Sequence, residues 1–146
     1  MTPARFSSWL SVGRRGLYCK PGDFHIDPHS AVPKALVTHG HSDHARPGHD
    51  HVLATQETLA IMDARLGSAA VSGTQAATYG EPLRIGDVTV AFVPAGHVLG
   101  SAQILIDYKG ARAIVSGDYK RSADPTCLPF EPVSYTHLTL PTILLV

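Results

Sequence analysis

Three histidines and an aspartate fall within six residues of this chain, directly after an apolar run that predicts a buried strand over residues 35–38. Along an extended segment, residues i and i+2 point the same way, so His39 and His41 can bind one metal ion. Asp43 and His44 follow at a turn and can face a second position beside the first. Imidazole and carboxylate suit Zn, Fe, Ni and Mn, which favours a metal site over a solvated, histidine-rich loop.

The remainder of the chain predicts short strands separated by glycine and proline turns, opening as a β-meander. The expected strands are residues 17–19, 24–27, 51–54, 76–79, 83–85, 88–94, 103–108 and 111–116, with a hairpin turn at Gly86 and Asp87. One helix is expected over residues 58–66. Thr55 is its predicted N-cap, Gly67 its end, and Leu59, Met62 and Leu66 its apolar face, which we interpret as core packing.

Two more candidate ligands follow predicted strand ends. His97 lies between glycines after residues 88–94, and Asp118 follows Gly117 after residues 111–116. Because chemistry in sheet-based enzymes collects at strand ends, we expect both to meet the cluster at residues 39–44. Asp27 also ends a strand, where it is either buried near the cluster or a turn residue before Pro28. His49 and His51 are expected to be exposed loop residues, the alternative being a role as extra ligands.

Composition narrows the function classes. The 146 residues suit one domain, and 44% apolar with 16% charged residues fits a soluble protein. Lys plus Arg and Asp plus Glu are both 12, so no global basic field steers nucleic acid, and polyanion binding would need local charges or metal. Cys19 and Cys127 are too few for a disulfide framework. Without a secretory signal or a membrane-length apolar run, the expected location is the cytoplasm, with no membrane partner.

Residues 134–146 differ in character, being uncharged and apolar at the end. We interpret residues 1–133 as a partial domain and residues 134–146 as a non-native or frayed tail. The alternative is a genuine last strand of the sheet.

The run His39–His44 resembles the H-x-H-x-D-H signature of the metallo-β-lactamase superfamily. That resemblance implies an α/β fold, the αββα sandwich with a dinuclear metal site at one edge. This chain would supply its N-terminal half, with mostly mixed or antiparallel sheet and flanking helices.

The resemblance also implies roles for these residues. The cofactors would be two divalent metal ions, zinc or alternatively manganese. His39, His41 and His97 would hold the first ion, Asp43 and His44 the second, with Asp118 bridging them and Asp27 supporting the site by hydrogen bonding. Asp43 and Asp118 would be catalytic, Asp43 by orienting the attacking water or accepting its proton.

A finer resemblance lies in Gly96–Ala102, which is similar to the third motif of the β-CASP branch of nucleases. Residues 38–48, 53–62 and 116–133 resemble bacterial DNA-ligase-associated exonucleases, also described as messenger-RNA 3′-end processing factors. This implies a metal-dependent phosphodiester hydrolase, an exonuclease on DNA or RNA, acting in DNA repair or RNA processing with a functional link to a DNA ligase.

Such relatives carry a further ligand histidine and a clamp domain downstream. We therefore expect this chain to be a truncated form with weak or no activity alone, and leave its oligomeric state open. Arg46, Lys120 and Arg121 are candidate phosphate contacts, or alternatively ordinary exposed cations. The rival functions are a small-molecule thioester or lactone hydrolase and an inactive metal-binding fragment. DNA or RNA, exonuclease or endonuclease, and zinc or manganese all stay open.

Overall fold

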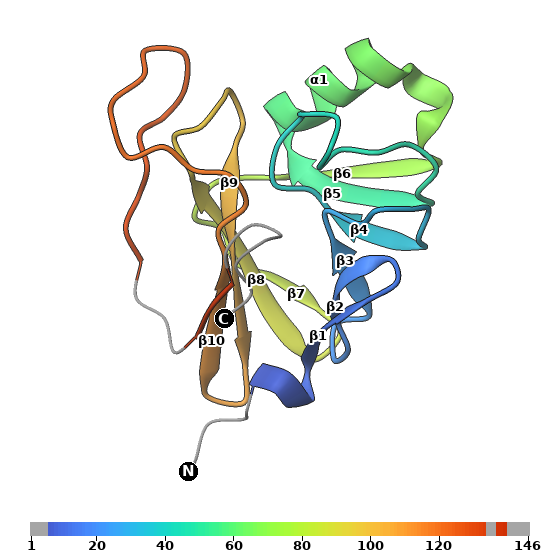
Figure 1. Ribbon diagram of the computed structural model, residues 1–146, viewed down its shortest axis with the longest axis vertical. Coiled ribbons are helices and arrows are strands. Elements are labelled where there is room, and N and C mark those ends of the chain that lie inside the picture. Colours follow the sequence, from blue (N-terminus) through green and yellow to red (C-terminus); the bar gives the residue numbers. More distant parts are fainter. Residues whose placement is uncertain (1–5, 134–136, 140–146) are drawn as a thin grey trace.

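The computed structural model describes residues 6–133 and 137–139, which form two β-sheets packed face to face and one α-helix (Figure 1). The first sheet has the order β1 (Leu10–Gly13), β2 (Gly16–Cys19), β3 (Phe24–Ile26), β4 (Lys34–Leu36), β5 (His51–Thr55) and β6 (Gly73–Ala77). The second has the order β11 (His137–Thr139), β10 (Ala111–Val115), β9 (Ala102–Tyr108), β8 (Val88–Pro94) and β7 (Leu83–Ile85). The helix is α1 (Gln56–Leu66), and short 3-10 turns occupy Phe6–Ser8 and Ser68–Ala70.

The first sheet is mixed. Strands β1, β2 and β3 pair antiparallel, which confirms the predicted meander, and β4, β5 and β6 then continue the sheet in parallel. Strand β4 is shorter than predicted. The Val37 amide still donates to the Leu53 carbonyl, but the Thr38 amide donates to Asp27 Oδ1 at 2.8 Å, so the ladder ends there. Strand β6 begins earlier than predicted because its residues 73–77 follow β5 in register.

The second sheet is antiparallel from β7 to β10, and the predicted hairpin at Gly86 and Asp87 is confirmed by the β7–β8 pairing. Strand β11 pairs parallel with β10. It lies within the segment that we interpreted as a tail, and residues 134–136 and 140–146 of that segment lie outside the described residues.

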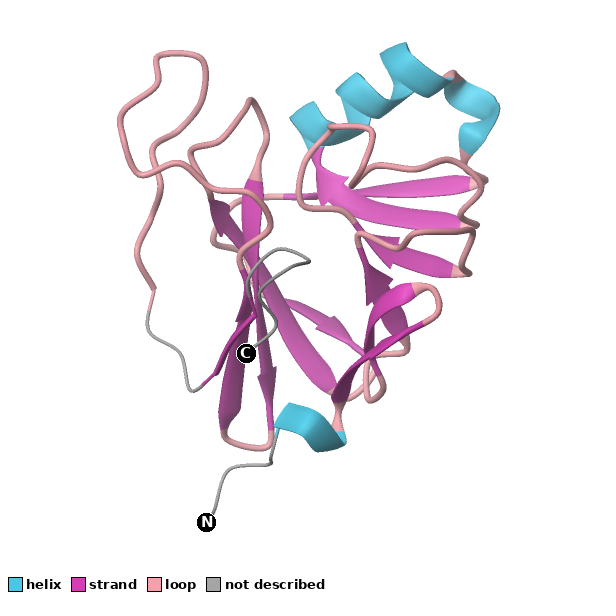
Figure 2. Cartoon of the chain, viewed as in Figure 1, coloured by secondary structure: helices cyan, strands magenta, loops and turns pink. Residues whose placement is uncertain are grey.

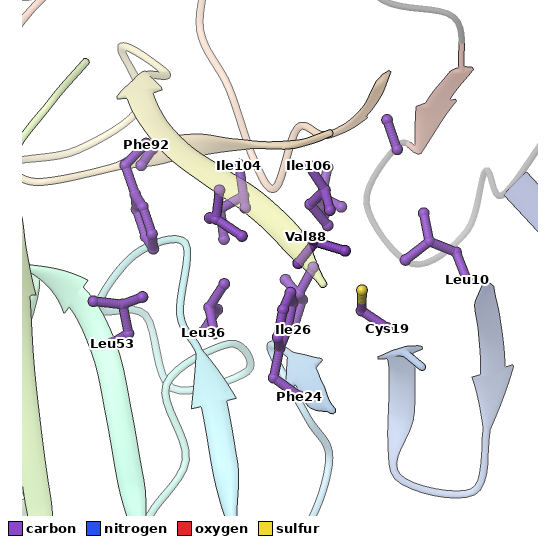
Figure 3. Packing of buried hydrophobic residues seen from close by; sticks show 14 of the residues in the cluster. Leu10, Cys19, Phe24, Ile26, Leu36, Leu53, Val88, Phe92, Ile104 and Ile106 are labelled. Atoms are coloured by element: carbon purple, nitrogen blue, oxygen red, sulfur yellow. The ribbon is translucent and has the colours of Figure 1, made fainter. Parts of the chain in front are cut away.

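The main core fills the space between the two sheets (Figure 3). Phe92, Ile104 and Ile106 from the second sheet face Leu36 and Phe24 from the first, and all five are at most 1% exposed. Burying each such side chain contributes roughly 1.5–3 kcal/mol, so this interface makes a large contribution to the stability of the fold.

Helix α1 packs on the outer face of the first sheet at its β5 and β6 end (Figure 2). Met62 is buried against Val37 and Val52, with Leu59 and Leu66 packed beside it, which confirms the predicted apolar face. The predicted caps are confirmed as well. Thr55 accepts a hydrogen bond from the Thr58 amide, and Gly67 ends the helix at φ +87°. The described residues therefore form an α/β fold of three layers, a helix and two sheets. Within them, no helix has both the length and the apolar character needed to cross a membrane.

Replacing Thr55 by alanine is expected to destabilise the protein by about 1–3 kcal/mol. The change removes the N-cap, which costs about 1 kcal/mol, and also a buried hydrogen bond from Thr55 Oγ1 to the Gly100 carbonyl at 2.8 Å. Chemical denaturation measures the loss. Thr78→Ala is the control because Thr78 is exposed, and an equal effect of the two substitutions would contradict the cap assignment.

Candidate metal centre

The candidate site lies where β4, β8 and β10 end. Strands β8 and β10 both pair antiparallel with β9, so they run in the same direction and their ends share one edge of the second sheet. The loop after β4 reaches that edge from the other sheet, and the Ala102 amide donates to the Thr38 carbonyl at 2.8 Å. The structure thus brings the three chain segments that carry the candidate ligands to one place (Figure 1).

A first group consists of His39, His41, His97 and Asp118, whose ligand atoms all lie within 4.8 Å of one another. His97 Nε2 is 3.2 Å from His41 Nδ1, and His39 Nε2 is 3.5 Å from Asp118 Oδ2. His39 is fully buried, whereas His41 is exposed and His97 half-buried, so the group is anchored in the core and opens to solvent.

A second group consists of Asp43, His44 and Asp118, whose ligand atoms likewise lie within 4.8 Å of one another. His44 Nε2 is 3.4 Å from Asp43 Oδ2 and 3.4 Å from Asp118 Oδ2. Asp118 is common to both groups. This His/Asp cluster could hold a metal ion, and its nitrogen and oxygen donors match the preferences of divalent transition metals.

The state of His39 also fits a metal ligand. Its Nε2 is buried without a hydrogen-bond partner among the described residues, an arrangement that costs roughly 1–3 kcal/mol if nothing else satisfies the atom. The 3.5 Å contact with Asp118 lacks hydrogen-bond geometry. Burial, reinforced by the neighbouring histidines, lowers the pKa of His39 to about 3, so its ring is neutral and offers a lone pair.

Asp27 lies behind the cluster. Its Oδ2 contacts His44 Nδ1 at 2.7 Å and accepts from Thr38 Oγ1 at 2.6 Å, while its Oδ1 accepts from the Thr38 amide. Burial alone would lower the pKa of His44, but the hydrogen bond and charge of Asp27, together with the charges of Asp118 and Asp43, outweigh it, and the pKa is raised. With Nδ1 engaged by Asp27, only Nε2 of His44 faces Asp43 and Asp118, the arrangement that orients metal-binding histidines in other proteins.

The loop that carries His97 is held by a residue to which the sequence analysis gave no role. Ser101 Oγ accepts hydrogen bonds from the His97 and Val98 amides, at 3.0 and 3.2 Å, and Tyr79 donates to the Ser101 carbonyl. Thr38 was also given no role. In the sequence, the signal for each residue was its position alone. Thr38 stands directly before His39, and Ser101 stands four residues after His97.

The three candidate phosphate contacts differ in their exposure and in the partners that their side chains have within the protein. Arg46 is half-buried and donates to the Asp43 carbonyl at 3.4 Å within its own loop. Lys120 is paired with Asp124 at 3.1 Å. Arg121 is exposed, three residues beyond Asp118 in the chain.

His49 is not an exposed loop residue, and that prediction was wrong. Its side chain is 1% exposed, and Nδ1 accepts from the Val32 amide at 3.2 Å, so the ring fills the space beneath the loop before β5. His51 is exposed as predicted, at the first position of β5. Neither residue belongs to the two ligand groups.

We expect the metal-free protein to lose stability as the pH falls below 6.5. Burial lowers the pKa of His49 below its ordinary value of 6.5, so the unfolded chain binds a proton more readily than the folded one. The stability contributed by neutral His49 is complete above pH 6.5 and declines below it. His49→Gln should flatten the fall of the urea midpoint between pH 6.5 and 5, and an unchanged slope would contradict this origin.

Comparisons with known proteins find similar proteins but do not assign the chain to a family. No family model matches it. It is 34% identical over 126 residues to a probable DNA ligase of Opitutus terrae, covering 83% of this chain and 12% of that protein. It is 32% identical over 119 residues to a ribonuclease of Thermus thermophilus, covering 65% of this chain and 27% of that protein. The chain therefore spans well under a third of these curated relatives.

Among solved structures, a protein of unknown function from Enterococcus faecalis is similar over 60% of this chain and 25% of its own, with a TM-score of 0.49 and 18% identity.

Proposed function

We propose that the cluster is the dinuclear metal centre of a hydrolase, with two divalent ions, zinc or alternatively manganese. The observation that carries this proposal is the sharing of Asp118 by two ligand groups. His39, His41 and His97 would hold the first ion, and Asp43 and His44 the second. The fold that would carry such a centre is the metallo-β-lactamase-type sandwich, with residues 1–133 as part of that domain.

Within that class, the substrate that we propose is a phosphodiester, which makes the protein a nuclease. The names of the two relatives, a ribonuclease and a probable DNA ligase, support nucleic acid as the substrate over a thioester or lactone. The more specific proposal is an exonuclease on DNA or RNA with a functional link to a DNA ligase. Because the relatives extend far beyond the matched region, we propose this activity for the complete protein and a weaker one for residues 1–146.

The chain's own residues supply orientation and proton transfer. Metal ions in the centre would lower the pKa of water and stabilise the charge that develops on the phosphate oxygens. The Asp43 side chain is 69% exposed beside His44. It can therefore orient the attacking water and accept its proton as the oxygen–phosphorus bond forms and the ester bond breaks. Arg46, Lys120 and Arg121 would contact the phosphate backbone.

The test measures hydrolysis by the protein after its metal has been removed with a chelator and zinc or manganese has been added back. Bis(p-nitrophenyl) phosphate reports phosphodiester chemistry without any need for a clamp, and labelled single-stranded DNA and RNA report nuclease action. Lactoylglutathione reports the rival thioester chemistry. We expect the two phosphodiester assays to respond to metal and the thioester assay to remain at background.

Two results would contradict the proposal. Metal-dependent thioester cleavage without phosphodiester cleavage would make the protein a small-molecule hydrolase. Binding of one or two ions per chain with no turnover of any substrate would reduce the site to metal binding.

A further inference from the structure

Thr38 connects Asp27 to His39 through a single hydroxyl group. Its Oγ1 lies 2.6 Å from Asp27 Oδ2 and 3.0 Å from His39 Nδ1, and the residue is 1% exposed. A hydroxyl carries one hydrogen, and a carboxylate can only accept. The hydrogen therefore goes to Asp27, and Thr38 Oγ1 must accept from His39 Nδ1–H.

This direction fixes the tautomer of His39. Of the two ring nitrogens of a neutral imidazole, one carries the hydrogen and the other the lone pair, and the partner of one nitrogen decides the state of the other. With the hydrogen on Nδ1, the lone pair lies on Nε2, the buried atom 3.5 Å from Asp118 Oδ2 that has no hydrogen-bond partner in the described part of the chain.

We propose that Thr38 is a positioning residue for the metal centre, which relays the orienting effect of Asp27 to His39. Asp27 would then orient two imidazole rings, that of His44 by direct contact at 2.7 Å and that of His39 through the Thr38 hydroxyl. The inference rests on the proposed metal centre, and it separates the two ligand groups. Removing the hydroxyl should impair the first group, which contains His39, and spare the second.

The backbone of Thr38 does not depend on this hydroxyl. Its amide donates to Asp27 Oδ1 at 2.8 Å, and its carbonyl accepts from the Ala102 amide at 2.8 Å. Valine at position 38 would keep both bonds and nearly the same shape, so a substitution there can remove the relay while leaving residue 38 in place.

The experiment compares Thr38→Val with Thr38→Ser, which restores a hydroxyl, and with Thr58→Val. Thr58 is equally buried, but its hydroxyl donates to the Gly100 carbonyl and contacts the Thr55 hydroxyl, and neither of these partners is an imidazole. Zinc affinity is measured by competition with a chromophoric chelator. The tautomer of His39 in the metal-free chain is read from its ring nitrogen chemical shifts.

For Thr38→Val we expect one of two zinc ions to bind about 10–100-fold more weakly, the usual effect of losing an outer hydrogen-bond partner of a ligand. We also expect the Nδ1–H signature of His39 to disappear. Thr38→Ser should restore both to near wild type, and Thr58→Val should change neither.

Unchanged zinc affinity in Thr38→Val, or a His39 ring that keeps its hydrogen on Nδ1 without the hydroxyl, would overturn the inference. Equal weakening of both ions, matched by Thr58→Val, would also overturn it, because that pattern indicates a general loss of structure. If the wild-type chain binds no zinc, the proposed metal centre itself fails, and the nitrogen shifts of His39 still decide whether Thr38 sets the tautomer.

Discussion

Asp118→Asn is expected to lower kcat/KM for bis(p-nitrophenyl) phosphate by more than about 100-fold. Loss of an outer partner of a metal ligand already costs about 10–100-fold, and Asp118 is itself the group shared by both ligand sets. Asparagine keeps the shape but removes the charge and one acceptor oxygen, so we expect the bound metal to fall as well. The measurements are steady-state kinetics and metal content per chain.

Asp63→Asn makes the same change in net charge on the exposed side of α1, away from the cluster, and should leave the activity unchanged. An Asp118→Asn protein with full metal content and a rate within a few-fold of wild type would contradict the shared-ligand role.

Gly117→Ala is expected to destabilise the protein by roughly 2–5 kcal/mol. Gly117 has φ +57°, a conformation that costs other residues about 1–2 kcal/mol. A Cβ there would also lie 2.7 Å from Thr38 Oγ1 and 2.8 Å from Thr38 Cβ, and overpacking of buried groups costs a further 1–3 kcal/mol or so.

Gly80→Ala separates these two contributions. Gly80 has φ +81° but nothing within 4 Å of an added Cβ, so this substitution carries the conformational cost alone. The measurement is the free energy of unfolding of each variant by urea titration. Equal losses for the two alanines would show that Thr38 yields easily and that the close approach is unimportant.

Much of the local structure was predictable because it depends on neighbouring residues. The strand and turn pattern, the cap at Thr55 and the helix end at Gly67 follow from alternation and from the conformations that these residues favour. The gathering of candidate ligands was predictable for a similar reason, since residues that follow strands running in one direction meet at one edge. Their roles as ligands remain a proposal.

The features that were missed depend on contacts between distant segments. The burial of His49 comes from the Val32 amide, 17 residues away, and no local pattern distinguishes it from the exposed His51. The early end of β4 and the relay through Thr38 both depend on Asp27, whose carboxylate replaces a strand partner for the Thr38 amide. Which strands form which sheet was likewise decided by packing rather than by periodicity.

The two ligand groups draw on both layers of the sandwich, His39, His41 and His44 from the loop after β4 and His97 and Asp118 from loops of the second sheet. An ion bound there would connect the two sheets at the end where these loops lie. Because such an ion binds the folded state and not the unfolded one, its affinity adds directly to the free energy of unfolding. Metal supply would then affect the free energy of unfolding of the protein as well as its proposed activity.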